Sequence, residues 1–169
     1  PRAPYACLFN HELLIVSHRR DIDPAHIASF VEKLTPTDVD AVMCCPMMWR
    51  CLLYPSAVDR SWQEYRPGQA PSKFRSYDYA MAYLHAGGDP VRDTLDACRR
   101  AGKAFFISYR MNDHHYLDDL DWPTHNAFWR RHPEYWLGDA PRTLSYNDTV
   151  WGVDDVRLLD YMRPEVRDQ

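Results

Sequence analysis

Three short apolar segments, separated by two segments with helical periodicity, constrain the fold of this 169-residue chain more than any other feature. The apolar segments cover residues 5–10, 39–45 and 104–109. Strands that are buried on both faces read as continuous apolar runs, and helices between them favour parallel pairing. The order strand, helix, strand, helix, strand therefore predicts an α/β fold with a parallel sheet.

Each predicted helix opens with an Asp-Pro pair, at residues 23–24 and 89–90. Aspartate caps helix N-termini, and proline suits the first helical position because it has no N–H to leave unbonded. The first helix is predicted over residues 24–34 and the second over 90–101. Gly102 then stands where a left-handed residue commonly ends a helix. The apolar residues of the first helix recur at the spacing of one helix face: Ile27, Phe30, Val31 and Leu34.

Composition narrows the classes of partner. The net charge is −4, from 24 acidic and 20 basic residues, so we expect no nucleic-acid partner. The apolar runs are far shorter than the roughly 20 residues of a membrane-spanning helix. Residues 1–10 lack the pattern of a signal peptide, but the chain does not begin with Met, so the localisation stays open.

No cofactor or disulfide framework is predicted. The five cysteines are an odd number without CxxC spacing, which favours buried thiols over disulfides or a zinc site. The spacing of a phosphate-binding loop and the GxGxxG pattern are both missing from the sequence, as are GxSxG and HExxH. These patterns leave nucleotide enzymes, serine hydrolases of that type and zinc proteases without support.

Two long segments, residues 46–88 and 110–161, are predicted as loops that follow the second and third strands. The first is dense in Trp, Tyr, Arg and Pro, as in "MMWRCLLYPSAVDRSWQEYRPG". Loops of this length in a compact domain are usually functional or disordered, and their aromatic content argues against disorder. We therefore expect these segments to carry the functional site.

Polar and aromatic residues follow each predicted strand. In parallel α/β folds, ligands bind beyond the carboxyl ends of the strands, so these residues are expected to line one pocket. An aromatic ring there could hold the apolar face of a sugar, while amide, carboxylate and guanidinium groups bind its hydroxyls. The candidate binding residues are Asn10, Trp49, Arg110, Asn112, Asp113 and His115.

Each candidate also has a purely structural interpretation. Asn112 and Asp113 suit a tight turn, and Arg110 could form a salt bridge at the edge of the fold. Aromatic rings under a long loop commonly serve packing alone. His114 and His115 are adjacent, and adjacent side chains of an extended chain point to opposite sides, so no metal site is predicted.

The segments "RMNDHH", "HPEYWLG" and "RPEVRD" resemble, in order and spacing, the start of bacterial glycosyl-hydrolase-like proteins, the family-10-like (β/α)8-barrel group. The resemblance runs through most of the chain. It implies a partial TIM barrel, with residues 1–169 as the N-terminal portion of a single barrel domain. The chain would then hold the first three βα units and reach the start of the third helix at residues 163–165, since a whole barrel takes about 250 residues.

The resemblance also implies a function, the substrate-binding part of a glycoside hydrolase acting on a polysaccharide or glycoconjugate. It assigns binding roles to Arg110, Asn112, Asp113 and His115, and less directly to Asn10 and Trp49. Asp113 is the one candidate catalytic carboxylate. Glycoside hydrolysis uses two carboxylates, and the family's other acidic motif is expected beyond Gln169, so this segment alone is expected to be inactive.

Two alternatives stay open at this point. The first is a barrel that binds carbohydrate without catalysis. The second is a metal-dependent hydrolase on the same fold, which would use His11, His114 or His115 together with Asp113. The chain also departs from common family members in having His11-Glu12 after Asn10, where an Asn/Asp-rich stretch is usual, and this puts a substrate contact from the first strand in doubt.

Overall fold

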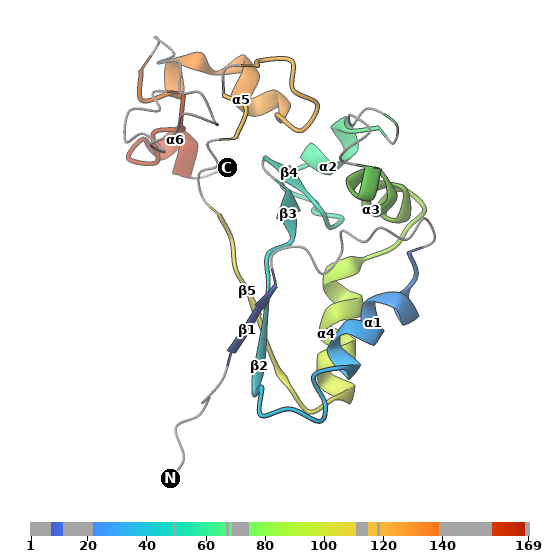
Figure 1. Ribbon diagram of the computed structural model, residues 1–169. Coiled ribbons are helices and arrows are strands. Elements are labelled where there is room, and N and C mark those ends of the chain that lie inside the picture. Colours follow the sequence, from blue (N-terminus) through green and yellow to red (C-terminus); the bar gives the residue numbers. More distant parts are fainter. Residues whose placement is uncertain are drawn as a thin grey trace, which may run out of the picture.

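The computed structural model of the chain describes most of its length (Figure 1). For residues 8–11 the description covers the backbone alone. The described ranges are 8–11, 22–48, 50–66, 68, 75–110, 115–117, 119–138 and 157–167.

A three-stranded parallel sheet forms the base of the fold. Its strands are β1 (Leu8–His11), β2 (Ala41–Cys44) and β5 (Ala104–Ile107), in the order β1-β2-β5. The central strand β2 pairs in parallel with both neighbours, with Val42 opposite Phe105. The predicted strands are therefore present: β2 is two residues shorter than the predicted run at its start and one at its end, β5 is two residues shorter at its end, and β1 extends one residue past the predicted end.

Helices α1 (Pro24–Glu32) and α4 (Pro90–Arg100) lie side by side on the same face of this sheet (Figure 1). The predicted inward stripe of α1 is confirmed at Val31, which is fully buried. Burying such apolar side chains against the sheet stabilises the fold at about 25 cal/mol per Å² removed from water. The residues of this core cluster are Ala28, Val31, Val42, Ala97 and Cys98.

Both helix starts have the capping bonds that the sequence predicts. The Asp23 side chain accepts from the N–H of His26 at 2.6 Å, and the Asp89 side chain accepts from the N–H of Arg92 at 3.0 Å. The second helix also ends as expected, because Gly102 has a left-handed φ of +66°. These bonds satisfy backbone groups that a helix terminus otherwise leaves without partners.

The segment 46–88, predicted as a loop, contains four elements among its described residues. They are an antiparallel hairpin of β3 (Met47–Met48) and β4 (Cys51–Leu52), followed by α2 (Ser61–Glu64) and α3 (Arg75–His85). The inward face of α3 packs with the hairpin and β2 into a second core cluster. Its fully buried members include Ile27, Leu53, Tyr65, Tyr77 and Met81.

The segment after β5 is also structured where it is described. It includes α5 (Ala127–Arg131), a short 3-10 helix at Pro133–Tyr135, and α6 (Pro164–Arg167). An isolated bridge between Trp136 and Leu159 joins its two parts. Figure 1 shows this segment beyond the carboxyl end of β5.

The prediction of a partial TIM barrel is wrong. The described residues form two small sheets, one parallel and one antiparallel, in a mixed α/β fold without the pattern of three βα barrel units. In a barrel, a third helix would follow β5 and pack back onto the sheet. The described helices after β5, α5 and α6, have only five and four residues and lie beyond the strand ends. Among the described helices, none is long and apolar enough to cross a membrane.

Candidate functional site at the carboxyl ends of the strands

The structure places three of the six predicted site residues. Asn10 lies in β1, where its backbone is opposite Met43. Arg110 is half-buried just after β5, and His115 is half-buried in a turn. Three others, Trp49, Asn112 and Asp113, lie outside the described residues, as does His114. The prediction of one common pocket for all six is therefore not tested.

Arg50 is a buried cation in the turn of the hairpin, with only 8% of its surface exposed. Its Nη1 donates to the carbonyl oxygen of His115 at 3.3 Å and to Nδ1 of His125 at 3.2 Å. Its guanidinium carbon also lies 4.8 Å from the ring centroid of Trp129, within the range of a cation–π contact. Arg50 therefore joins the hairpin to the segment that contains α5.

The hydrogen bonds of His125 fix its tautomer. Its Nε2 lies 2.8 Å from the carbonyl oxygen of Tyr116, and a carbonyl can only accept, so Nε2 carries the hydrogen. Nδ1 then has a free lone pair for Arg50. Burial, and after it the positive charge of Arg50, lowers the pKa of His125 from 6.5 to about 4. His125 is thus neutral at neutral pH.

The indole rings of Trp129 and Trp136, together with Arg157, pack and hydrogen-bond around the contact between Arg50 and His125. Trp129 and Trp136 stack with ring centroids 4.9 Å apart, and Nε1 of Trp129 donates to the carbonyl oxygen of Arg157 at 2.8 Å. Arg157 in turn donates from Nη1 to the carbonyl oxygen of Leu117 at 2.5 Å. The chain before α5, α5 itself and the segment at 157–167 are therefore fixed to one another.

Tyr54, Asp59 and Tyr161 act electrostatically on Tyr109, and we call these four residues the tyrosine rim. Tyr109 lies two residues beyond the end of β5 and is 52% exposed. Partial burial, and then the charges of Tyr161, Asp59 and Tyr54, raise the pKa of Tyr109 to about 12. The pKa of Tyr161 is raised by burial, opposed by Arg50 and increased by Asp59. Arg50 and Asp59 therefore lie within electrostatic reach of Tyr161.

Asp59 is held in place from its own loop. Its Oδ1 accepts from the N–H of Ser61 at 2.8 Å, and its N–H donates to Oγ of Ser56 at 3.1 Å. Trp62 closes the loop by donating from Nε1 to the carbonyl oxygen of Ser56 at 3.0 Å. The position of this carboxylate is therefore set before any ligand binds.

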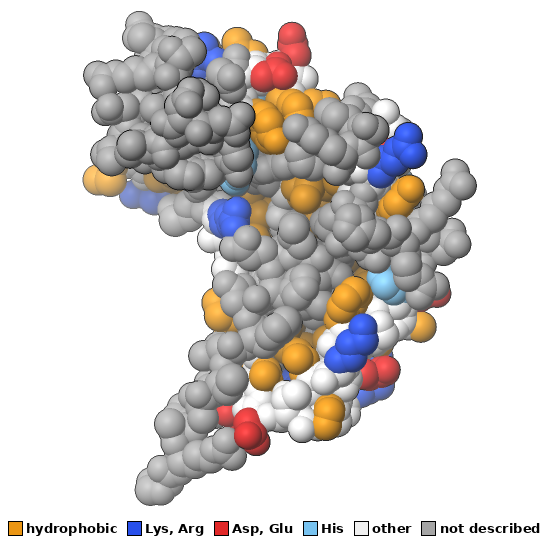
Figure 2. All heavy atoms as spheres, viewed as in Figure 1, with side chains coloured by type: hydrophobic (Ala, Val, Ile, Leu, Met, Phe, Trp, Pro, Cys, Tyr) orange, Lys and Arg blue, Asp and Glu red, His pale blue; other side chains and the backbone are white. Residues whose placement is uncertain are grey.

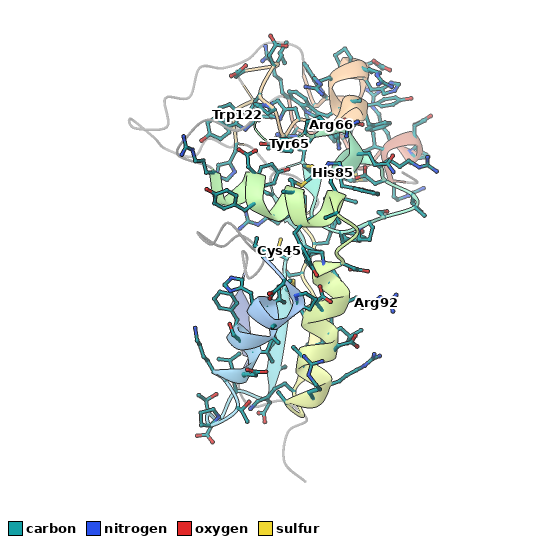
Figure 3. All side chains as sticks on the ribbon, turned by 90° about the vertical axis from the view of Figure 1, so that its right-hand side faces the viewer. Cys45, Tyr65, Arg66, His85, Arg92 and Trp122 are labelled. Atoms are coloured by element: carbon teal, nitrogen blue, oxygen red, sulfur yellow. The ribbon has the colours of Figure 1, made fainter. Side chains whose placement is uncertain are left out.

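Other polar groups near the hairpin serve packing. Figure 3 shows Tyr65 and His85 close together, and Nε2 of His85 lies 2.8 Å from the carbonyl oxygen of Tyr65. The Tyr65 hydroxyl donates to Asp78, which also accepts from the N–H of Gly68 at 2.9 Å. These contacts tie the α2 region to α3.

A metal site is not seen among the described residues, which contain no group of three His, Cys, Asp or Glu side chains able to hold an ion. Burial raises the thiol pKa to about 12 at Cys44 and Cys51 and to about 11 at Cys98. Protonated thiols are poor metal ligands. The side chains of the metal-hydrolase alternative, apart from His115, lie outside the described residues, so that alternative stays a prediction.

Arg50, His125 and the tyrosine rim were not among the predicted site residues. Arg50 carries a visible signal, because it interrupts the otherwise apolar stretch "MMWRCLL". A charge in such a position is either exposed at a turn or paired in the interior. His125 and Tyr161 have no local signal, because their partners are distant in sequence. No protein-family model and no curated protein sequence matches this chain.

Proposed function

We propose that the tyrosine rim binds carbohydrate, and that this chain supplies the substrate-binding part of a glycoside hydrolase acting on a polysaccharide or glycoconjugate. The observation that carries the proposal is the half-exposed ring of Tyr109, two residues beyond the carboxyl end of β5, within electrostatic reach of Tyr161, Asp59 and Tyr54. A sugar presents an apolar C–H face and a ring of hydroxyls. An aromatic face with nearby polar groups matches both.

The rim offers both kinds of hydrogen-bonding group that sugar hydroxyls require. The raised pKa of Tyr109 and Tyr161 keeps their hydroxyls protonated at any physiological pH, so they can donate as well as accept. The carboxylate of Asp59 can only accept. Neighbouring sugar hydroxyls could therefore donate to Asp59 and accept from a tyrosine at the same time.

The buried contacts of Arg50 support binding indirectly. Binding sites gain affinity when their side chains are held in place before the ligand arrives. Arg50 fixes the hairpin, after which the chain continues to Tyr54 and Asp59, against the chain at His115 and His125. Arg110 follows Tyr109 in the sequence and His115 binds Arg50 through its carbonyl, and both stay candidate contacts.

Carbohydrate binding without catalysis is the second candidate. Asp59 is the one carboxylate in the tyrosine rim, whereas glycoside hydrolysis uses two, set about 5 to 9.5 Å apart. Asp113 stays the candidate catalytic carboxylate in the enzyme proposal. Hydrolysis of aryl glycosides and polysaccharides by the longest available form of the protein separates the two candidates.

Affinity electrophoresis of the 169-residue chain through gels that contain soluble polysaccharides tests the binding. We expect retardation by at least one polysaccharide, and about tenfold weaker binding for Tyr109→Ala, because stacking on an aromatic ring is lost. The matched control is Phe106→Ala, which removes an exposed ring from β5, three residues before Tyr109. A folded chain that no polysaccharide retards, or equal losses for the two variants, would contradict the proposal.

A further inference from the structure

The contact between Arg50 and His125 exists in only one protonation state of the histidine. Nη1 of Arg50 is a donor, and it reaches Nδ1 of His125 at 3.2 Å. If His125 takes up a proton, Nδ1 also becomes a donor, and two cations face each other in a buried site. The contact must then break or lengthen.

Among the described residues, the groups that act most strongly on the pKa of His125 include no carboxylate side chain to offset this repulsion. Arg130 on α5 acts on His125 with the same sign as Arg50. The backbone of Tyr116 and of Asp119 favours the proton, and the Trp129 ring lies 4.3 Å from the imidazole between ring centroids. The carboxylate of Asp119 accepts from the N–H of Asp121 at 3.1 Å.

Arg50 has neighbours besides His125 on its own side of the contact. His115 contributes its backbone carbonyl to Arg50, and Tyr161 lies near enough for Arg50 to lower its pKa. A second link between the α2 region and α5 exists at the surface, where the exposed Glu64 carboxylate accepts from the N–H of Ala127 at 2.5 Å. Burial raises the pKa of Glu64, so this link also titrates in acid, and a variant of His125 is needed to separate the two links.

We propose that the Arg50–His125 contact is an acid-sensitive latch: proton uptake by His125 releases the hairpin from the α5 segment and opens the tyrosine rim. The latch does not depend on what the rim binds. It does predict that any ligand that needs Tyr109 and Tyr161 together with the hairpin residues loses affinity when the latch opens.

Hydrogen exchange of the whole chain, followed by mass spectrometry and corrected for the intrinsic effect of pH, tests the latch. Between pH 7 and about pH 4, we expect peptides from the hairpin and from residues 119–131 to lose at least about tenfold of their protection. Peptides from α1 and α4 should keep theirs. The region that opens lies in the upper part of Figure 1, and the two helices lie below it.

Two variants sharpen the test. His125→Gln can accept from Arg50 and donate to Tyr116 but does not titrate, so its exchange should be independent of pH in this range. His115→Gln is the matched control, because His115 contacts Arg50 only through its backbone carbonyl in the bond described, and it should keep the transition. A transition that survives in His125→Gln, or a loss of protection that also spreads through α1 and α4, overturns the proposal. If His125→Gln does not fold, an NMR titration of the wild-type imidazole decides: a pKa that matches the opening supports the latch, and one near 6.5 overturns it.

Discussion

Replacement of Gly88 by alanine should force apart the junction between α3 and α4. The N–H of Gly88 donates to the carbonyl oxygen of Tyr83 at 3.0 Å, and the Tyr83 ring lies directly over the Gly88 Cα, where a Cβ would overlap three ring carbons. The ring cannot turn away freely, because its hydroxyl donates to Oδ2 of Asp93 on α4 at 2.5 Å. Either the ring or the helix junction must move.

The expected cost follows from these two contacts. Inserting a methyl group into a packed site typically costs about 1–3 kcal/mol. Losing a hydrogen bond to a charged group costs about 1.5–3 kcal/mol, and the lower end applies because Tyr83 and Asp93 are only half-buried. Gly88 does not have a positive φ, so no backbone strain is added. We expect Gly88→Ala to lower the free energy of unfolding by about 3 kcal/mol.

Urea denaturation followed by circular dichroism measures this cost in a double-mutant cycle with Tyr83→Ala. Once the ring is gone, Gly88→Ala should cost less than about 0.5 kcal/mol. The matched control is Gly87→Ala, because Gly87 has a φ of +94° and open space around its Cα. It should cost about 1 kcal/mol in both backgrounds from backbone strain alone. An equal cost of Gly88→Ala with and without the Tyr83 ring would refute the steric explanation.

Three further predictions concern buried polar groups. The folded chain has a lower pKa at His125 than the unfolded chain, so the unfolded chain binds more protons between pH 6.5 and about 4. Urea unfolding should therefore show that the free energy of unfolding decreases as the pH is lowered from 6.5 to about 4, by on the order of 3 kcal/mol, and His125→Gln should flatten this dependence. The buried Cys44, Cys51 and Cys98 should react with iodoacetamide only after unfolding, as peptide mapping would show, and rapid native labelling would contradict their burial. Thr94→Val should lower the free energy of unfolding by about 1 kcal/mol in thermal unfolding, because the buried hydroxyl donates to the carbonyl oxygen of Pro90 at 2.7 Å. Thr94→Ser keeps a hydroxyl that can make this hydrogen bond, so its effect should be smaller.

The sequence correctly predicted the helices whose ends are fixed by residues close by in the chain. The caps at Asp23 and Asp89 and the end at Gly102 depend on residues within one helical turn, so the sequence pattern was sufficient for α1 and α4. The apolar runs likewise located the three strands of the parallel sheet. Helix α3 carried the same kind of signal and was missed. Its buried residues Tyr77, Ala80, Met81 and Leu84 have the spacing of one helix face.

The error at α3 has a physical explanation. Dense aromatic and proline residues around positions 49–67 favoured a loop for the whole segment, although the pattern changes after residue 75. The hairpin was missed because β3 and β4 have two residues each, which is too short for an alternating pattern to be recognised. Figure 2 shows apolar side chains at the surface of the described part of the chain, so apolar content alone did not separate core from surface.

The barrel was wrong for a different reason. Strand and helix periods determine single βα units, but closure into a barrel depends on the tilt and stagger of many strands together. A parallel sheet of three strands is compatible with several architectures, and the resemblance chose among them without a local constraint. What decides against the barrel units is the described part of the chain after β5, which holds turns and the short helices α5 and α6 and no third helix packed on the sheet.

The position of Arg50 connects the fold to the candidate site. A buried guanidinium is costly to desolvate, and it is tolerated only where hydrogen bonds and ring contacts surround it. The carbonyl of His115, Nδ1 of His125 and the Trp129 ring meet part of that requirement, and all three come from the chain that follows β5. These three contacts form when that chain is folded against the hairpin. The same condition brings Tyr161 within the electrostatic reach of Arg50 and Asp59 and so completes the tyrosine rim. Folding of the hairpin and assembly of the rim are, on this reasoning, one event, and a change that frees Arg50 should disturb both.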